Sequence, residues 1–317
     1  AIVVQAAHRI GSRALKNNTL WAIAAASFVA IFALDAPFPL IVGVAAAVGY
    51  VGGRVSPHTF QTGGGHGASN ASYGPALIDD HTPTPAHAHF SYAGLMQVLL
   101  AGAVLWAVPM GVLCAVFGWE HSFTQMGWFF TKAALLTFGG AYAVLPYVYQ
   151  GAVSGFGWVT PTQMMDGLAL GETTPGPLIM VVAFVAFIGG YVKALLGPES
   201  LFAAGALAAC LVTWFTFLPS FIFILAGGPL VESTHRNIKF TAPLTAITAA
   251  VVGVVINLAL FFGYHLLWPA GFEGAFDVRS ALIAVGAAVM LFKYKRSVMQ
   301  TIGVCALVGL AVKLIPL

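Results

Sequence analysis

The chain has few charged residues and few cysteines for its length. Only 7% of its 317 residues are charged, whereas 59% are hydrophobic and the mean hydropathy is +0.91. An ordinary soluble domain carries about 25% charged residues, so this composition excludes one. Cys114, Cys210 and Cys305 lie in apolar runs without metal-ligand spacing, and we expect them to be buried packing residues. The net charge of +3, on scattered basic residues, predicts no nucleic-acid partner.

The sequence instead contains long apolar runs. Most are near the roughly 20 residues that a helix needs to cross a bilayer, and longer than the roughly 10 of a barrel strand. The sequence therefore predicts an all-α polytopic membrane protein in a lipid bilayer. A broken region covers 158–193, and the other spans are expected near residues 19–35, 38–55, 95–117, 127–150, 200–225, 241–267, 279–293 and 298–316.

Residues 56–90 interrupt this pattern with a polar stretch rich in Gly, Pro, Ser, Thr and His, which is typical of a linker. Imidazole is a common metal ligand, so a divalent metal ion exporter with a His-rich sensing loop is one alternative. No cysteine accompanies the histidines and their spacing is irregular, which favours a solvated loop, and we expect no metal site. The histidines are His58, His66, His81, His87 and His89.

Two helical hairpins repeat the same layout, because residues 21–53 align without gaps on residues 282–314. The first hairpin follows basic residues and turns at Asp35, whereas the second follows acidic residues and turns at KYKR, residues 293–296. Basic residues in short loops favour the cytoplasm, so the hairpins are expected to point in opposite directions. Inverted repeats of this kind are typical of secondary transporters. Counting 158–193 as one broken crossing also places KYKR on the cytoplasmic side. The alternative is that 158–193 is re-entrant, in which case this count fails.

The repeat also predicts three parts of the chain. Residues 1–55 are interpreted as the end of a first transporter half, closed by its helical hairpin. Residues 56–90 are the linker, and residues 91–317 are the second half. Because the first part is so much shorter than the second, we expect this chain to lack the front of the first half.

The stretch DGLALGETTPGP, residues 166–177, breaks an apolar region with prolines and carboxylates. Such backbone is tolerated at membrane depth only where it is buried in protein or lines a water-filled cavity. Proline suits the first turn of a helix, so a helix is predicted to start near Pro177 and to run toward Tyr191. Its start exposes the amide groups of Gly176, Leu178 and Ile179 and the positive end of a helix dipole, which favours an anion site.

A second break is predicted upstream, where Gly139 and Gly140 interrupt a span and Pro146 follows. Glycine lets backbone or ligand approach closely. Lys132 precedes the pair inside the apolar segment and is a candidate positive charge for an anion. The alternative is a lysine that extends to the membrane interface near Trp128.

Asp166 and Glu172 are the carboxylates of this region, and an intramembrane carboxylate is by default a functional hypothesis. Glu172 is expected either to pair with Lys132 or to take up a proton and couple transport to protons. The alternative is an N-terminal cap, in which Glu172, Thr173 and Thr174 accept hydrogen bonds from free amides.

An intramembrane aspartyl protease is a further alternative, in which Asp166 would need a second carboxylate facing it. Glu172 is the nearest, but a helix breaker follows it. No nucleophile, base and orienter are arranged together, so we expect no enzyme, no catalytic residue and no cofactor.

TFGGAYAVLPYVYQ followed by DGLALGETTPGPLIMVVAFVAFIGGY resembles the signature of the chromate ion transporter family. The resemblance covers 91–317, and 1–55 is similar to the end of that family's first half. It implies a two-half, multi-pass protein of the bacterial inner membrane that exports chromate, confers chromate resistance and recognises sulfate as an analogue. The matching motif residues are Phe138, Gly139, Gly140, Pro146, Asp166, Gly167, Glu172, Thr173, Thr174, Pro175, Gly176 and Pro177.

Together these observations predict alternating access around a site that holds a tetrahedral dianion near the middle of the membrane. A homodimer is compatible with the small-residue face AAGALAAC, residues 203–210, which also suits internal packing. The predicted substrate-binding residues are Lys132, Phe138, Gly139, Gly140, Asp166, Glu172, Thr173, Thr174, Pro175, Gly176 and Pro177.

Overall fold

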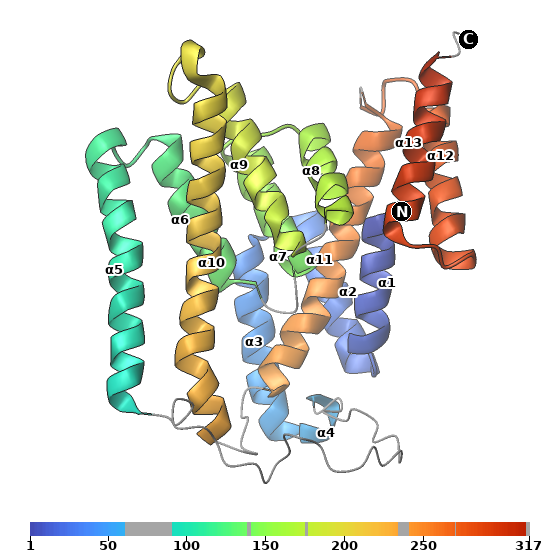
Figure 1. Cartoon of the computed structure of the whole chain (residues 1–317). Helices are drawn as coiled ribbons and strands as arrows, with labels where there is room; N and C mark the ends of the chain where they lie inside the picture. Colours follow the sequence, from blue (N-terminus) through green and yellow to red (C-terminus); the bar gives the residue numbers. More distant parts are fainter. Residues whose placement is uncertain (61–90, 138–140, 175–176, 234–240, 270, 315–317) are drawn as a thin grey trace, which may run out of the picture.

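A computed structural model of the chain describes residues 1–60, 91–137, 141–174, 177–233, 241–269 and 271–314. Every regular element within these residues is a helix, which confirms the predicted all-α class (Figure 1). Four helical segments among them are long and apolar enough to cross a membrane: Phe38–Val55, Tyr92–Phe117, Pro198–Pro229 and Thr241–Leu267. The protein is therefore a polytopic membrane protein.

Three long helices form the frame of the molecule: α5 (Tyr92–Phe117), α10 (Leu201–Ser233) and α11 (Thr241–Leu267). At a rise of 1.5 Å per residue each is about 40 Å long or longer, enough for the roughly 30 Å of a hydrocarbon core. We call the end where α3 (Phe38–Val55) stops and α5 begins the linker end, and the opposite end the far end. In Figure 1 the linker end is at the bottom.

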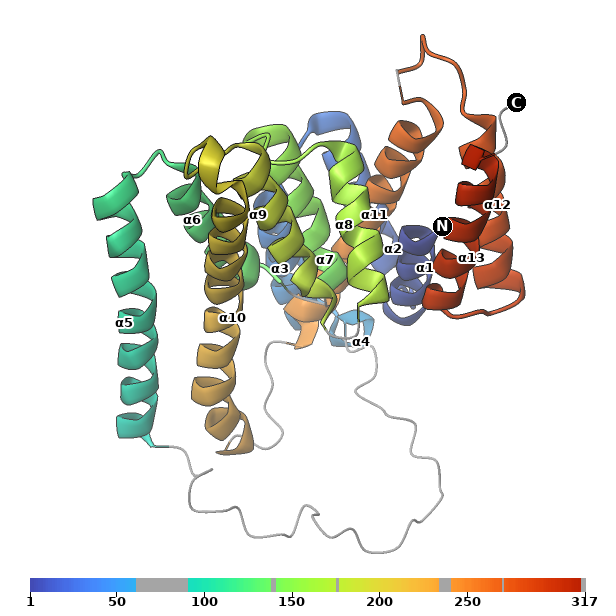
Figure 2. The same ribbon diagram turned by 45° about the horizontal axis from the view of Figure 1, so that its top comes forward.

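The four helices between α5 and α10 do not cross. They are α6 (Ser122–Leu135), α7 (Ala141–Tyr149), α8 (Pro161–Thr173) and α9 (Val181–Val192). With 14, 9, 13 and 12 residues, each is about 21 Å long or shorter. Figures 1 and 2 show that α6 and α8 enter from the far end and that α7 and α9 return to it.

Contacts across each pair support this re-entrant geometry. The Phe129 ring of α6 stacks on Tyr147 of α7 with centroids 4.7 Å apart. A Cβ at Gly167 of α8 would lie 2.6 Å from the Phe184 ring of α9. The prediction that 158–193 is one broken crossing, and that 127–150 is a span, is therefore wrong. Glycine and proline mark the break, but they do not specify whether the next helix continues or reverses.

The repeated hairpins do point in opposite directions, as predicted. Hairpin α2–α3, with α2 at Asn18–Leu34, opens toward the linker end. The second hairpin consists of α12 (Val278–Ala288), its π-helical extension η5 (Val289–Lys293) and α13 (Val298–Leu314), and it opens toward the far end. Its turn at 294–297 stops near mid-height, and the cytoplasmic side of KYKR stays a prediction.

The remaining elements are short or support the frame. Helix α1 (Ile2–Ala14) packs on α11 through small buried residues, including Gly11. Within the linker the structure describes α4 (Pro57–Phe60), whereas 61–90 lie outside the described residues. The cysteines are not buried as expected, because Cys210 is exposed and Cys114 and Cys305 are half-buried.

The small-residue face of α10 packs inside the chain. A Cβ at Gly190 of α9 would lie 2.6 Å from the Ala204 carbonyl, and one at Gly205 would lie 2.8 Å from that of Phe187. Helices α9 and α10 therefore approach closely along this face. The face serves internal packing, and its residues give no support to a homodimer.

Candidate functional site

Helix α8 positions the predicted carboxylates, and its start is fixed by its own sequence. The Thr160 side chain accepts a hydrogen bond from the Gln163 amide at 3.2 Å, and the Gln163 side chain accepts one from the Thr160 amide at 2.9 Å. This capping box, followed by Pro161 at the first helical position, is a strong helix start.

The return helix begins where the sequence predicts it. Pro177 precedes a 3₁₀ turn, η3 (Leu178–Met180), which leads directly into α9. The amide of Met180 donates to the Pro177 carbonyl at 2.9 Å. The amides of Leu178 and Ile179 lie in this first turn, where a helix has no earlier carbonyl to receive them.

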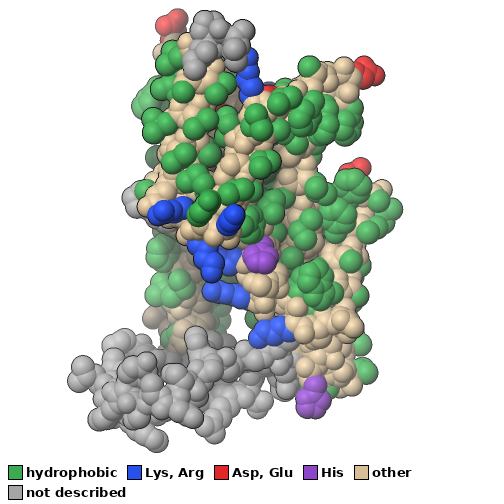
Figure 3. Space-filling model, turned by 90° about the vertical axis from the view of Figure 1, so that its right-hand side faces the viewer, with side chains coloured by type: hydrophobic (Ala, Val, Ile, Leu, Met, Phe, Trp, Pro, Cys, Tyr) green, Lys and Arg blue, Asp and Glu red, His purple; other side chains and the backbone are tan. Residues whose placement is uncertain are grey.

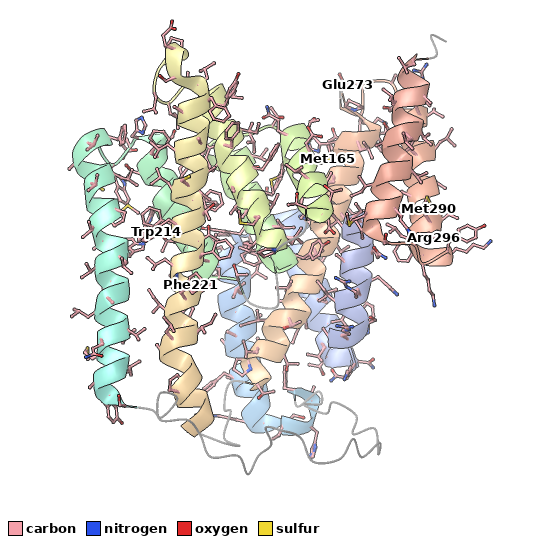
Figure 4. The ribbon with its side chains drawn as sticks, in the orientation of Figure 1. Met165, Trp214, Phe221, Glu273, Met290 and Arg296 are labelled. Atoms are coloured by element: carbon pink, nitrogen blue, oxygen red, sulfur yellow. The ribbon has the colours of Figure 1, made fainter. Side chains whose placement is uncertain are left out.

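One face of α8 lines a cavity of about 580 Å³, which we call the Glu172 cavity. Its other walls come from α1, α7, α11, α12 and α13. The α8 residues lie at positions i, i+3, i+4 and i+7, which is one face of a helix. They are Met165, which is labelled in Figure 4, and Leu168, Ala169 and Glu172.

Glu172 is the acidic residue of this cavity. Its Oε1 is buried and has no hydrogen-bond partner within the described part of the chain. The exposed Arg9 on α1 interacts with Glu172 electrostatically. An ionised carboxylate without hydrogen bonds is costly to bury, so the unpartnered oxygen calls for an explanation that packing alone does not give.

The opposite face of α8 lines a second cavity of about 490 Å³ between α8 and α9, which we call the hairpin cavity. Phe184 and Phe187 of α9 contribute to its apolar wall. The α8 residues here follow the same helical spacing, and a Cβ at Gly171 would have no contact closer than 3.4 Å. They are Gly167, Leu170, Gly171 and Thr174, with Pro177 after the break. Helix α8 is thus a wall between two cavities.

The threonines at the end of α8 do not act as N-terminal caps. The Thr174 hydroxyl donates to the Leu170 carbonyl at 2.7 Å, and the Thr173 hydroxyl lies 3.1 Å from the Ala169 carbonyl. Both therefore satisfy carbonyls of the preceding helix, as Ser and Thr side chains often do. In the part of the chain that the structure describes, these two hydroxyls act at the end of α8 and not at the start of the return helix.

Two predicted residues lie apart from the cavities. The Lys132 ammonium sits 5.6 Å from the centre of the Trp128 ring, on α6, and Lys132 lines neither the Glu172 cavity nor the hairpin cavity. Asp166 is exposed on α8 and also lines neither. The structure does not bring Lys132 and Glu172 together. Of the other predicted residues, Phe138, Gly139, Gly140, Pro175 and Gly176 lie outside the described residues.

Three polar residues of the Glu172 cavity were missed by sequence reasoning: Tyr142, Ser280 and Thr301. Thr301 is 2% exposed, and its hydroxyl donates to the Ser297 carbonyl at 3.0 Å. A lone threonine in an apolar helix gives no signal for a site. Only the tertiary packing of α13 against α8 reveals it.

Aromatic rings anchor the loop that leads into α8. Trp158 is 3% exposed and stacks on Phe130 of α6 with centroids 6.1 Å apart. Its Cβ lies 3.1 Å from the position a Cβ would take at Gly189 of α9. These contacts tie α6, α9 and the start of α8 together, so the α8–α9 hairpin rests on a fixed support.

Comparison with known proteins places this architecture in a family. A sequence model of the family described as chromate transporter matches residues 124–310. The chain is 34% identical over 257 residues to the chromate transport protein of Pseudomonas aeruginosa, covering 80% of this chain and 51% of that protein. It is 27% identical over 188 residues to the chromate transport protein of Cupriavidus metallidurans, covering 59% and 41%.

The chain thus spans about half the length of the curated relatives it matches. No solved structure matches. The family match covers more than half of the chain and includes both re-entrant hairpins and the hairpin α12–α13. The chain therefore belongs to the chromate transporter family.

Proposed function

We propose that this protein carries chromate, and tetrahedral oxyanions of the same shape such as sulfate, across the bacterial inner membrane and out of the cell by alternating access. The observation that carries the proposal is the broken α8–α9 hairpin, which ends inside the molecule with a cavity on each face of α8. The names of the relatives, which are chromate transport proteins, support the substrate class. We also propose that residues 1–55 and 91–317 are parts of two transporter halves.

The hairpin cavity suits the anion. Pro177 opens the return helix beside it, and the amides of Leu178 and Ile179 in that first turn supply donors and the positive end of a helix dipole. The apolar walls raise the strength of each such interaction, because the local dielectric is low. The Thr174 hydroxyl is a further donor once it rotates away from the Leu170 carbonyl.

Glu172, on the other face of the same helix, suits the coupling proton. Its buried and unpartnered oxygen makes the neutral carboxyl the less costly form inside the protein. Proton uptake and release at Glu172 would alter the packing of α8 between the two cavities. A single rigid helix thereby links the proton to the anion, which is what coupled transport requires.

Transport into inside-out membrane vesicles tests this proposal. We expect wild-type vesicles to take up labelled chromate and excess sulfate to suppress the uptake. Glu172→Gln keeps the shape of the side chain but removes its proton exchange. We expect uptake to fall at least about tenfold, because a hydrogen bond to a charged group contributes about 1.5–3 kcal/mol and about 1.4 kcal/mol is a factor of ten.

Glu199→Gln is the matched control, since Glu199 is exposed at the far end and lines neither cavity. Its uptake should equal that of the wild type. If sulfate does not compete, the oxyanion class is wrong. If both glutamine variants transport normally, Glu172 has no role in coupling.

A further inference from the structure

Helix α1 carries a stripe of exposed basic side chains. Arg9, Arg13 and Lys16 are spaced as positions i, i+4 and i+7, so the first two lie on one face and Lys16 follows just beyond the helix end. The opposite face of α1 is formed by small residues that pack on α11. The stripe therefore points away from the core.

The tip of the α12–α13 hairpin adds a second group of charges beside this stripe. Lys293, Lys295 and Arg296 are all exposed at the turn. The His8 ring of α1 meets the Phe292 ring of η5 edge-on, with centroids 5.8 Å apart, so the tip rests against α1. We call these six residues the basic surface: Arg9, Arg13, Lys16, Lys293, Lys295 and Arg296.

The shape of the tip is set by its backbone. Lys295 adopts a left-handed conformation with φ of 50°, and the Arg296 amide donates to the Met290 carbonyl at 3.0 Å. This closes the helix end and turns the chain back into α13. Figure 4 shows Arg296 at this inner end of the hairpin, near the mid-height of α10.

The position of the basic surface disfavours contact with lipid tails. Figure 3 shows its face of the molecule, where most Lys and Arg side chains lie between mid-height and the linker end and the visible acidic side chains lie above them. Helices α10 and α11, which are long enough to cross the membrane, extend beyond this height at both ends. A basic side chain at the bilayer centre is costly, so such residues face protein or a water-filled cavity.

The basic surface also lies next to the Glu172 cavity. Val4 of α1 lines that cavity, and Arg9 follows five residues later, about 7.5 Å along the helix axis. Helix α13 likewise runs from the basic tip into the cavity wall, where it contributes Thr301 and Ile302.

We propose that the basic surface is the wall of a water-filled vestibule that opens toward the linker end and collects oxyanions for the transport site. This inference rests on the proposed function, since the anion gathered here is its substrate. A recess lined by one sign of charge with low-dielectric walls concentrates ions of the opposite sign and raises their rate of arrival by about 10- to 1,000-fold. Arginine also binds tetrahedral oxyanions in a bidentate manner.

Cysteine labelling tests the vestibule without depending on transport. Lys295→Cys and Arg9→Cys are introduced in turn into a chain whose three cysteines are serine, in membrane vesicles of each orientation. We expect a negatively charged methanethiosulfonate to react several-fold faster than a positively charged one, and only from the linker end. The preference should shrink in high salt, because exposed charges are screened within about 10 Å at 0.1 M.

Two control positions calibrate the labelling. Leu100 on α5 is 65% exposed on an apolar face, so Leu100→Cys should resist both reagents. Lys193→Cys, at the far end after α9, should react only from that end. If Lys295→Cys and Arg9→Cys resist both reagents, lipid or protein covers the surface and no vestibule exists. Equal rates with both reagents would also overturn the proposal.

Transport kinetics then connect the vestibule to the substrate. The triple variant Lys293→Gln, Lys295→Gln, Arg296→Gln should raise the KM for chromate about tenfold at low ionic strength, with Vmax unchanged and the difference lost in high salt. Lys193→Gln should leave KM unchanged. A fall in Vmax alone would contradict collection of the anion. Vesicles that take up no chromate, yet label with the expected charge preference, would refute the proposed function and keep the vestibule.

Discussion

The hairpins α6–α7 and α8–α9 share one backbone design but differ in how they are filled. Both enter from the far end and turn back inside the molecule. Each first helix leads into its break through a threonine whose hydroxyl donates to the carbonyl four residues earlier, Thr137 to Ala133 and Thr174 to Leu170, both at 2.7 Å. Their sequences TFGG and TPGP then break the chain.

The two hairpins differ in how their side chains pack. Hairpin α6–α7 is filled by large rings, and Phe129 alone contacts Tyr147, Phe130, Phe156 and Trp158. Hairpin α8–α9 instead has a cavity on each face of α8 and a carboxylate oxygen without a partner. A re-entrant break is therefore not a site by itself. Within the residues that the structure describes, hairpin α6–α7 is mainly an aromatic support, which we call the aromatic hairpin, although Tyr142 of α7 reaches the Glu172 cavity. Helix α8 of the other hairpin lines both cavities, and we propose that this hairpin binds the anion.

Filling the hairpin cavity should have the largest effect on transport. A Cβ at Gly171 would have only ordinary contacts of 3.4 Å or more, so a small side chain fits there. Leucine extends further into the cavity, and we expect Gly171→Leu to abolish chromate uptake while the protein stays folded. Vesicle uptake and thermal unfolding of the purified protein measure the two effects.

The control for this substitution is Gly111→Leu on α5, where a Cβ would meet nothing within 4 Å. It should leave both uptake and unfolding temperature unchanged. Normal uptake by Gly171→Leu would remove the hairpin cavity from the transport path and would make the two hairpins equivalent.

Overfilling the aromatic hairpin should lower the stability of the protein rather than block transport directly. A Cβ at Gly151 would overlap the Phe129 ring, which is 4% exposed and held by its aromatic neighbours. Overpacking of this kind costs about 1–3 kcal/mol. We expect Gly151→Ala to lower the unfolding temperature and the amount of folded protein, with uptake falling only in proportion to that amount.

The same alanine change at Gly111 provides the reference, and should be neutral or slightly stabilising because alanine favours helix. If Gly151→Ala leaves stability intact but stops uptake, the aromatic hairpin takes part in transport directly, and the distinction between support and site fails.

The comparison also shows what could be read from the sequence. The four long spans that begin near residues 38, 95, 200 and 241 follow from hydrophobic periodicity, and the helix start at Pro177 follows from proline chemistry; the structure confirms both. The break itself comes only after Thr173, because α8 continues through most of 166–177. The reversal of the chain at each break could not be predicted, because it depends on tertiary contacts such as that between Gly167 and Phe184.

Side-chain partners were harder still to predict. Lys132 looked like a partner for Glu172 because both are charged and lie near helix breaks. The structure places it over Trp128, on the aromatic hairpin, whereas Glu172 lines a cavity to which Thr301 and Tyr142 also contribute. Residues that line one cavity from about 130 positions apart in the sequence, such as Glu172 and Thr301, leave no local pattern that one sequence can reveal.

Thr137 and Thr174 provide the test with the smallest expected effect. Thr137→Val and Thr174→Val remove the same hydroxyl from the same kind of hydrogen bond, so each should cost a similar small amount of stability, about 0.5–1.5 kcal/mol. Only Thr174 lines the hairpin cavity and has a second role as a donor to the anion. We therefore expect Thr174→Val to raise the KM for chromate several-fold, and Thr137→Val to raise it less. Equal changes in KM would mean that the hydroxyl at Thr174 only closes its helix, and that the amides after Pro177 bind the anion without it.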